Sequence, residues 1–171
     1  MDNVPSWWQR LILTLAATGF ASWLLARVLP YLDRTVLNLT RNRQTATRLL
    51  TGLPALTITT RGARTGRMYR TPLLYLQEGE NYILIATNFG QRENPGWYYN
   101  ILAHPEIEVA FNGETSKYLG SEVEGLDWRA YWEMAVAHYP GYSKYQHRAA
   151  GRRIPIIILS PLDRSADEAP G

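Results

Sequence analysis

The sequence predicts a mainly β (α+β) fold, a six-stranded antiparallel barrel with short flanking helices and an N-terminal helical extension. The first observation is the change of apolar period from about 3.6 to about 2 near residue 55, which is typical of half-buried strands. The second is a set of tight turn sequences, such as Glu-Gly-Glu-Asn at 78–81 and Asn-Gly at 112–113, which favour hairpin connections. The third is a length of 171 residues without cysteine, which allows one core without disulfides.

Residues 1–50 form the predicted N-terminal helical segment. Leu11 to Ala26 is a run of sixteen uncharged residues, which is shorter than the ~20 residues that span a bilayer. Tryptophans and arginines flank the run, as in segments anchored at a membrane interface. Because no small-residue cleavage site follows Pro30, we expect a cytoplasmic protein whose residues 7–32 lie on the inner membrane surface. A short span, and a helix packed on its own domain or on a dimer partner, are the alternatives.

The barrel domain is expected at residues 51–161, with a polar tail at residues 162–171. Strands are predicted where apolar residues alternate or run together between turns. These stretches are residues 55–60, 69–76, 82–87, 107–111, 114–123 and 154–159. The connection between the first two strands is then a hairpin loop.

Two short helices interrupt the predicted strands. Asn94 as N-cap and Pro95 at the first helical position predict a helix that His104 ends. Asp127 is expected to cap another helix, which ends near His138. The tyrosine-rich stretch that follows is interpreted as a loop because it contains proline and glycine.

Charge is distributed unevenly along the chain. Residues 1–77 carry ten arginines against Asp2 and Asp33, a net charge of +8, whereas residues 78–171 carry eight basic and thirteen acidic groups, a net charge of −5. Such a basic block favours a polyanionic partner: a phosphate-bearing cofactor, a membrane surface or nucleic acid. Nucleic acid is disfavoured because residues 34–68 contain no aromatic side chain on which bases could stack.

The predicted hairpin loop is the strongest candidate binding element. Between Thr59 and Pro72 lie four arginines, two glycines and several threonine hydroxyls. Glycines let backbone N–H groups turn toward a ligand, and arginine side chains match phosphate or carboxylate geometry. The stretch therefore indicates an anion-binding hairpin, with a solvated basic turn as the alternative.

Three further clusters could contribute to a site. Residues 86–90 end a strand in small and amide side chains, against which a planar ligand could lie. The helix with Trp97 begins near Asn94 and could receive an anion at its N-terminus. Three tyrosines at a spacing of three residues offer flat walls and phenol groups, with packing at the barrel end as the alternative. They are Tyr139, Tyr142 and Tyr145.

Other chemistry is disfavoured by the residues that are present. There is no cysteine, and the three histidines lack metal-ligand spacing, so no metal site is expected. The sequence contains no Walker A, GxGxxG or GxSxG motif and no evident nucleophile or general base. This favours a site in which a cofactor does the chemistry and the protein positions it.

In order along the chain, the motifs resemble the deazaflavin-dependent nitroreductases, coenzyme F420-binding oxidoreductases with the flavin-type split β-barrel. The resemblance covers about Leu53 to Pro161. It rests on six markers, which are T-T-x-G-x-[KR]-[ST]-G at Thr59–Gly66, P-L at Pro72–Leu73, A-[ST]-x-x-G at Ala86–Gly90, N-P-x-W-Y-x-N at Asn94–Asn100, Y-P-x-Y-x-x-Y at Tyr139–Tyr145 and R-x-I-P-I at Arg152–Ile156.

The resemblance implies roles for individual residues. The acidic tail of the cofactor would lie on the hairpin, and its deazaflavin would lie at the strand end. The residues that would bind the cofactor are Arg64, Thr65, Gly66, Arg70, Thr71, Pro72, Ala86, Thr87, Asn88, Gly90, Asn94 and Trp97. The substrate pocket would be lined by Tyr139, Tyr142 and Tyr145. Catalytic roles would fall to Thr87, Tyr139 and Tyr142.

The sequence departs from the family pattern at three positions. Ala63 stands where a basic residue is frequent, Tyr69 where an arginine is common, and Asn88 where a lysine is frequent. The cofactor is therefore expected to be F420, with FMN as the alternative. Since the F420 tail carries several negative charges and FMN one phosphate, the four arginines favour F420.

The function that the resemblance implies is F420H2-dependent transfer of a hydride to a quinone or nitroaromatic acceptor, a small hydrophobic redox substrate. The alternatives are an FMN-dependent split-barrel oxidoreductase and a non-catalytic module that binds flavin, haem or lipid. A homodimer is compatible with the sequence.

Overall fold

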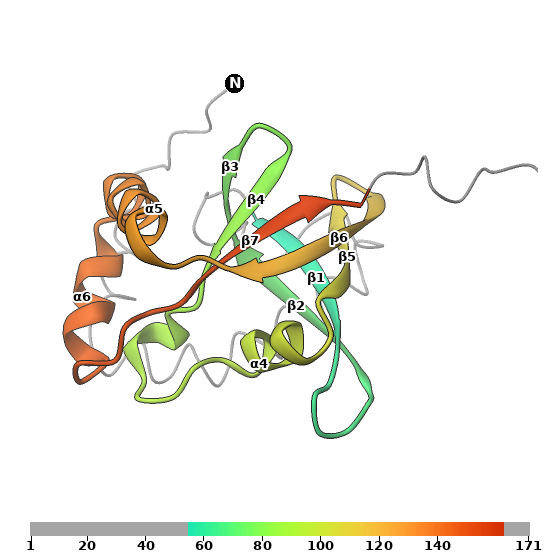
Figure 1. Ribbon diagram of the computed structural model, residues 1–171, viewed down its shortest axis with the longest axis horizontal. Helices are drawn as coiled ribbons and strands as arrows, with labels where there is room; N and C mark the ends of the chain where they lie inside the picture. Colours follow the sequence, from blue (N-terminus) through green and yellow to red (C-terminus); the bar gives the residue numbers. More distant parts are fainter. Residues whose placement is uncertain (1–54, 163–171) are drawn as a thin grey trace, which may run out of the picture.

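The computed structural model describes residues 55–162, which form a curled antiparallel sheet with helices at its ends (Figure 1). In this part of the chain the strands are β1 (Ala55–Arg61), β2 (Met68–Leu74), β3 (Leu76–Glu78), β4 (Asn81–Ile85), β5 (Glu106–Phe111), β6 (Glu114–Glu122) and β7 (Ile156–Pro161). The helices are α4 (Gly96–Ala103), α5 (Gly125–His138) and α6 (Gly141–Arg148), with the 3-10 turn η1 (Asn88–Gly90).

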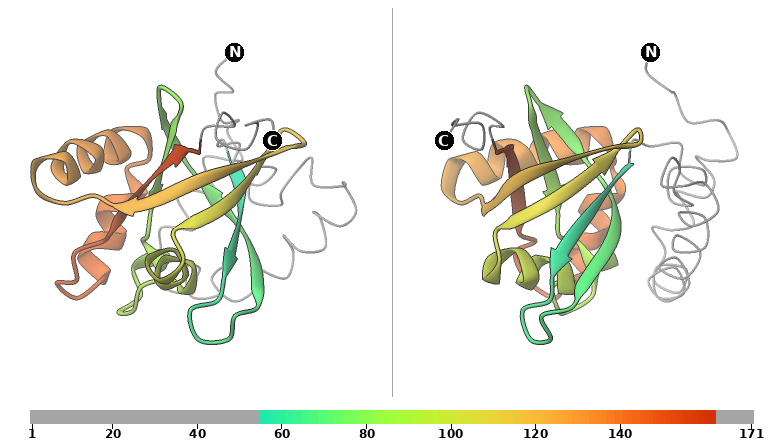
Figure 2. Two further views of the ribbon diagram at one scale, coloured as in Figure 1. Left: turned by 45° about the vertical axis from the view of Figure 1, so that its right-hand side comes forward. Right: turned by 90° about the vertical axis from the view of Figure 1, so that its right-hand side faces the viewer.

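The strands form a single sheet in the order β2-β1-β5-β6-β7-β4-β3, and every pairing is antiparallel. The two strands at the ends of this order, β2 and β3, are separated in sequence by Tyr75 alone. The sheet is curled, as Figure 2 shows, because a single residue joins the first strand of the order to the last. The predicted mainly β, split-barrel-like fold is confirmed in this coarse sense.

The predicted number of six strands is wrong, because the strand expected over residues 69–76 is broken at Tyr75. The Tyr75 ring turns inward and meets Tyr82 and Phe111 edge to face, at 5.0 Å and 5.5 Å between ring centroids. Leu76, the next residue, belongs to a different core cluster. Packing neighbouring side chains into two cores bends the chain and divides the predicted strand into β2 and β3.

Two apolar clusters hold the domain together. One lies inside the curl and includes Leu56, Leu84 and Trp97. The other lies beneath α5 and α6 and includes Ile83 and Ile156. Strands β4 and β7 are buried on both faces, which explains their nearly continuous apolar sequences. The two helices α5 and α6 are seen together at one end of the sheet in Figures 1 and 2.

Helix boundaries differ from the sequence predictions in three places. The tyrosine-rich stretch is not a loop: it forms α6, because Pro140 precedes the first helical residue, where proline costs no hydrogen bond. Helix α4 begins at Gly96 with Pro95 in the N-cap position, so Asn94 is not the cap. Asp127 lies in the first turn of α5 and Glu124 occupies its N-cap.

A hydrogen bond between two side chains connects α5 to the β3–β4 hairpin. Because its donor is a titratable phenol, the free energy of unfolding depends on pH in the alkaline range. The Tyr131 hydroxyl donates to Glu78 Oε2 at 2.5 Å, and this bond, with burial, raises the pKa of Tyr131 to about 12. Since the unfolded chain releases this proton near pH ~10, the stabilisation is complete below that pH and is lost as the pH rises toward ~12. Denaturant unfolding across this range should show the decline, and Tyr131→Phe should make it shallower, while the other tyrosines with a raised pKa, such as Tyr98, maintain the rest. A decline of equal slope in the variant would contradict this assignment.

The predictions for residues 1–50, including the membrane segment at 7–32, and for the tail at 163–171 lie outside the described residues. Between residues 55 and 162, no helix is both long and apolar enough to cross a membrane.

Candidate functional site

The β1–β2 hairpin has a loop that is ordered by its own backbone. The Gly62 N–H donates to the Arg67 carbonyl at 2.7 Å, and the Gly66 N–H donates to the Gly62 carbonyl at 2.8 Å. Gly66 has φ +66°, a conformation that glycine adopts without strain. A Cβ at Gly62 would lie 2.6 Å from both Thr65 Oγ1 and the Tyr69 ring, so a larger residue would displace these two side chains. The two glycines thus fix the shape of the loop.

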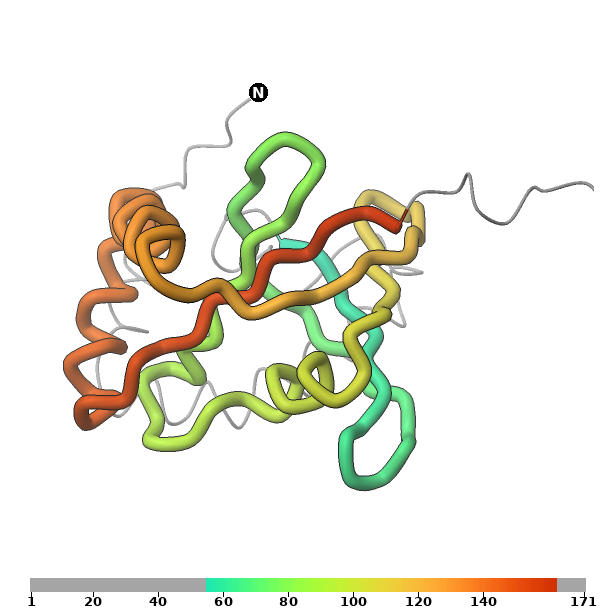
Figure 3. The backbone as a smooth tube through the Cα atoms, viewed as in Figure 1, coloured from blue at the N-terminus to red at the C-terminus, as the bar shows by residue number. Residues whose placement is uncertain are grey.

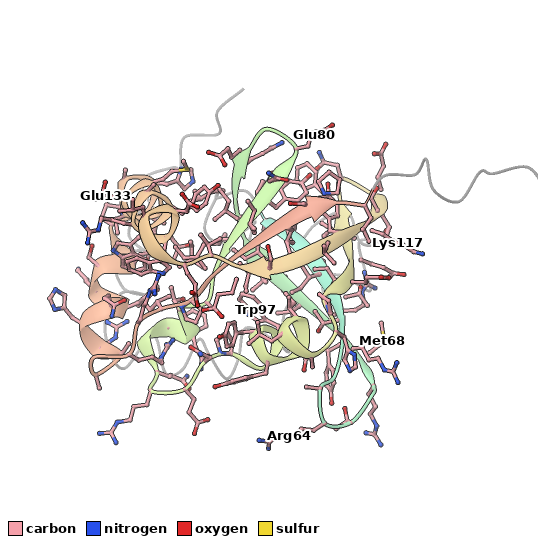
Figure 4. All side chains as sticks on the ribbon, in the orientation of Figure 1. Arg64, Met68, Glu80, Trp97, Lys117 and Glu133 are labelled. Atoms are coloured by element: carbon pink, nitrogen blue, oxygen red, sulfur yellow. The ribbon has the colours of Figure 1, made fainter. Side chains whose placement is uncertain are left out.

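Four arginine side chains project from this hairpin into solvent. They are Arg61, Arg64, Arg67 and Arg70, and Figure 4 shows Arg64 at the tip of the loop. The Thr65 hydroxyl is engaged within the hairpin, 3.1 Å from the Tyr69 hydroxyl and 3.3 Å from the Arg67 N–H that donates to it. Tyr69, at a position where the resemblance implies an arginine, therefore supports the loop instead of adding charge.

The hairpin is tied to α4 through one amide side chain. Asn100 Oδ1 accepts a hydrogen bond from the Ala63 N–H at 3.0 Å, and Asn100 Nδ2 donates to the Thr60 hydroxyl at 3.1 Å. Thr60 is fully buried. The position of the basic loop relative to α4 is therefore set by specific contacts, and Asn100, the last residue of the N-P-x-W-Y-x-N stretch, is a structural residue that the sequence reasoning did not assign.

The end of strand β4 continues into a strained loop. Ala86 is buried and its N–H donates to the Pro155 carbonyl at 2.9 Å. Asn88, Phe89 and Gly90 then have φ values of +46°, +55° and +78°. The half-buried Thr87 hydroxyl makes no hydrogen bond to any residue between 55 and 162.

Asn94, at the other end of this loop, has a partner that the sequence reasoning missed. Arg152 Nη1 donates to Asn94 Oδ1, and Arg152 Nη2 donates to the carbonyls of Thr87 and Gln91 at 3.1 Å and 3.0 Å. Burial lowers the pKa of Arg152 from its ordinary value. A contact between residues 58 positions apart leaves no local signal in the sequence, although Arg152 opens the R-x-I-P-I marker.

Trp97, at the beginning of α4, is 7% exposed and belongs to the cluster inside the curl. Figure 4 places it between the hairpin and the β4 end. The next residue, Tyr98, donates its hydroxyl to Glu122 Oε2 at 2.8 Å and so fastens α4 to β6. Burial, followed by the bond to Glu122, raises the pKa of Tyr98 to about 12.

The three candidate tyrosines form one buried aromatic group around α6. Tyr139 and Tyr142 have ring centroids 5.2 Å apart, and Tyr145 is 6.2 Å from each. The hydroxyls of Tyr139 and Tyr145 are 3.4 Å apart. Burial raises the pKa of all three phenols. The packing interpretation accounts for this burial, and roles at the substrate stay a prediction.

The predicted site residues fall into one continuous series of elements. The hairpin is bonded to α4, the loop of residues 86–95 leads into α4, and α6 packs on that loop through Tyr145 and Gly90. Figures 1 and 3 show this series along one side of the domain, with the hairpin and α6 at opposite ends. Gly90 itself is buried against α6. Thr71 and Pro72 are half-buried in β2, at the end of the sheet order.

The proteins that this chain resembles indicate its family. A family model described as F420H2-dependent quinone reductase matches residues 32–161. The chain is 30% identical over 112 residues to an F420H2-dependent quinone reductase of Mycobacterium tuberculosis, which covers 63% of this chain and 73% of that protein. The solved structure of an F420-H2 dependent reductase (FDR-A) is 31% identical with a TM-score of 0.57, covering 63% of this chain and 94% of the other.

A second solved structure, described as a domain-swapped dimer, is 26% identical with a TM-score of 0.60. It covers 83% of this chain and 100% of its own. The family match spans most of the described domain and every site element discussed above. The chain therefore belongs to the F420H2-dependent quinone reductase family.

Proposed function

We propose that this protein is an F420H2-dependent quinone reductase in which the β1–β2 hairpin binds the acidic tail of the cofactor and the β4 end binds the deazaflavin. The observation that carries this proposal is the ordered hairpin with four exposed arginines, none of which pairs with an acidic side chain among residues 55–162. Guanidinium groups suit phosphate and carboxylate ligands, which the tail of F420 supplies. The residues present therefore fit this cofactor.

The protein's own residues would bind, orient and protect the reactants. When bound, reduced F420 supplies the hydride that a quinone accepts. Arg64 and Arg70 would hold the tail, and the Thr87 hydroxyl would hydrogen-bond the ring system. The phenols of Tyr139 and Tyr142 are protonated at neutral pH and would be available to donate a hydrogen bond to the acceptor. Because burial raises their pKa, they would release a proton less readily than an exposed phenol. A nitroaromatic acceptor is the second substrate class compatible with this arrangement.

Membrane association and dimerisation stay predictions. Membrane association through residues 7–32 would bring the domain to a membrane-borne quinone. A homodimer is supported by the likeness to the domain-swapped dimer.

Removing hairpin charge tests the proposed cofactor. We expect the double variant Arg64→Ala/Arg70→Ala to weaken F420 binding by about 100-fold or more, because two charge-assisted contacts of about 1.5–3 kcal/mol each are lost. The salt dependence of the dissociation constant should also become shallower. Quenching of F420 fluorescence on titration measures both quantities.

Arg129→Ala is the matched control, since Arg129 is also an exposed arginine but lies on α5. An unchanged F420 affinity in the double variant would refute the assignment of the tail to the hairpin. Titrating FMN in parallel tests the cofactor itself: tight FMN binding without a response to F420 would overturn the choice of F420.

A further inference from the structure

The guanidinium of Arg152 connects both ends of the loop between β4 and α4. Its Nη2 donates to the Thr87 carbonyl at the beginning of the loop and to the Gln91 carbonyl further along, and its Nη1 donates to the side-chain oxygen of Asn94 just before α4. The residue itself lies between α6 and β7. A single side chain from a distant part of the sequence therefore bridges the segment that carries Thr87.

The loop needs such a contact because its backbone is strained. Asn88 and Phe89 are non-glycine residues with positive φ, a conformation that costs about 1–2 kcal/mol per residue. The bonds inside the loop are few: the Gly90 N–H donates to Thr87, the Gln91 N–H donates to Asn88, and the Asn88 side chain donates to the Glu93 carbonyl. Bonds from outside the loop must offset the remaining strain.

Two arginines supply these outside bonds. Arg148 Nη2 donates to the Phe89 carbonyl at 3.2 Å, in addition to the three bonds from Arg152. Arg152 is itself held in place, since its N–H donates to the Ala149 carbonyl at 3.0 Å and its carbonyl accepts from Gln146 Nε2 at 2.7 Å. The end of α6 is in this way rigidly connected to the loop.

The contacts require arginine specifically. The three acceptors are neutral oxygens in different positions, which a planar group with five N–H donors can reach together and a lysine ammonium cannot. The Arg152 side chain is partly buried, its Nε has no hydrogen-bond partner, and it forms no ion pair with residues 55–162. Holding a cation in these surroundings is unfavourable for stability. The position of Arg152 is therefore better explained by the loop that its hydrogen bonds hold in place.

We propose that Arg152 is a positioning residue that holds Thr87 and Asn94 in a fixed relation, and thereby shapes the surface that the β4 end presents to its ligand. The ligand part of this statement rests on the proposed function, in which the β4 end binds the deazaflavin of F420. The loop part rests on the contacts of Arg152 alone.

Hydrogen exchange in the cofactor-free protein tests the loop part. In Arg152→Lys we expect the amides of Gly90 and Gln91 to exchange about tenfold faster or more, because bonds of about 1–3 kcal/mol are lost locally. Amides of β1 and β5 should keep their wild-type rates. In Arg152→Ala, millimolar guanidinium ion should restore slow exchange. Arg153→Lys is the control, since the Arg153 guanidinium stacks on Trp128, 4.6 Å from its ring, and not on the loop.

Titration with F420 tests the ligand part, where Arg152→Lys should raise the dissociation constant about tenfold and Arg153→Lys should leave it unchanged. Unchanged loop exchange in Arg152→Lys would overturn the proposal, and so would equal acceleration throughout the sheet, which indicates general destabilisation. If the wild-type protein bound no F420, the proposed function would fail, while the exchange rates would still decide whether Arg152 positions the loop.

Discussion

Tyr142→Ala is expected to lower the free energy of unfolding by about 3–5 kcal/mol, the range found when a large buried aromatic side chain is removed. Tyr142 is 8% exposed, and its ring packs against Tyr139, Tyr145 and Trp132. Alanine would leave a cavity between α5 and α6 that a tightly packed aromatic group fills poorly. Denaturant unfolding followed by circular dichroism measures the change.

Two companion variants separate packing from chemistry. Tyr99→Ala removes a tyrosine that is 48% exposed on α4 and should cost far less. Tyr142→Phe keeps the ring and removes the hydroxyl, which makes no hydrogen bond to a residue between 55 and 162, so stability should change by less than about 1 kcal/mol. Lower quinone turnover in Tyr142→Phe would support a role of the phenol at the substrate, whereas unchanged turnover would assign Tyr142 to packing alone.

Gly90→Ala should cost about 2–5 kcal/mol, because two unfavourable effects coincide at this position. Its φ of +78° strains any residue with a Cβ, by about 1–2 kcal/mol. The added Cβ would also lie 2.8 Å from the Tyr145 carbonyl oxygen and 3.0 Å from the Arg148 Cβ, a close contact with a helix, and overpacking of this kind typically costs about 1–3 kcal/mol. Equilibrium unfolding measures the loss.

The effect should extend from stability to binding. Because α6 must move away from the loop to admit the methyl group, F420 affinity should fall as well. Gly96→Ala provides the comparison: Gly96 begins α4, and an added Cβ there meets no atom within 4 Å. That substitution should be neutral or slightly stabilising, since alanine favours helix by up to about 1 kcal/mol. Equal costs at both glycines would show that the contact with α6 is not tight.

Much of the sheet could be predicted because its signals are local. The alternation in residues 55–60 and the Asn-Gly turn at 112–113, where both residues have positive φ, specify strands and a hairpin within a few residues. The break at Tyr75 could not be predicted in this way. It depends on which core each neighbouring side chain enters, and that is decided by strands far away in the sequence.

In the candidate site, too, the features with local sequence signals could be predicted and those that depend on distant contacts could not. The glycines and arginines of the hairpin are adjacent in sequence, so the anion-binding prediction needed no tertiary information. The spacing of Tyr139, Tyr142 and Tyr145 by three residues could have indicated one face of a helix, since residues three apart are neighbours there. Arg152 is different: its bonds to Thr87 and Asn94 exist only after β7 has brought it to the β4 end.

The position of β7 has a consequence for the order in which the chain folds. β7 pairs with both β6 and β4, yet it is the last strand in the described sequence (Figure 3). During synthesis β1, β2, β5 and β6 can pair as they emerge, whereas the β3–β4 hairpin has no strand joining it to the rest until β7 is available. Closure of the sheet is therefore a late, long-range step, with loop-closure entropy to overcome and two unpaired strand edges exposed to other chains until it is complete.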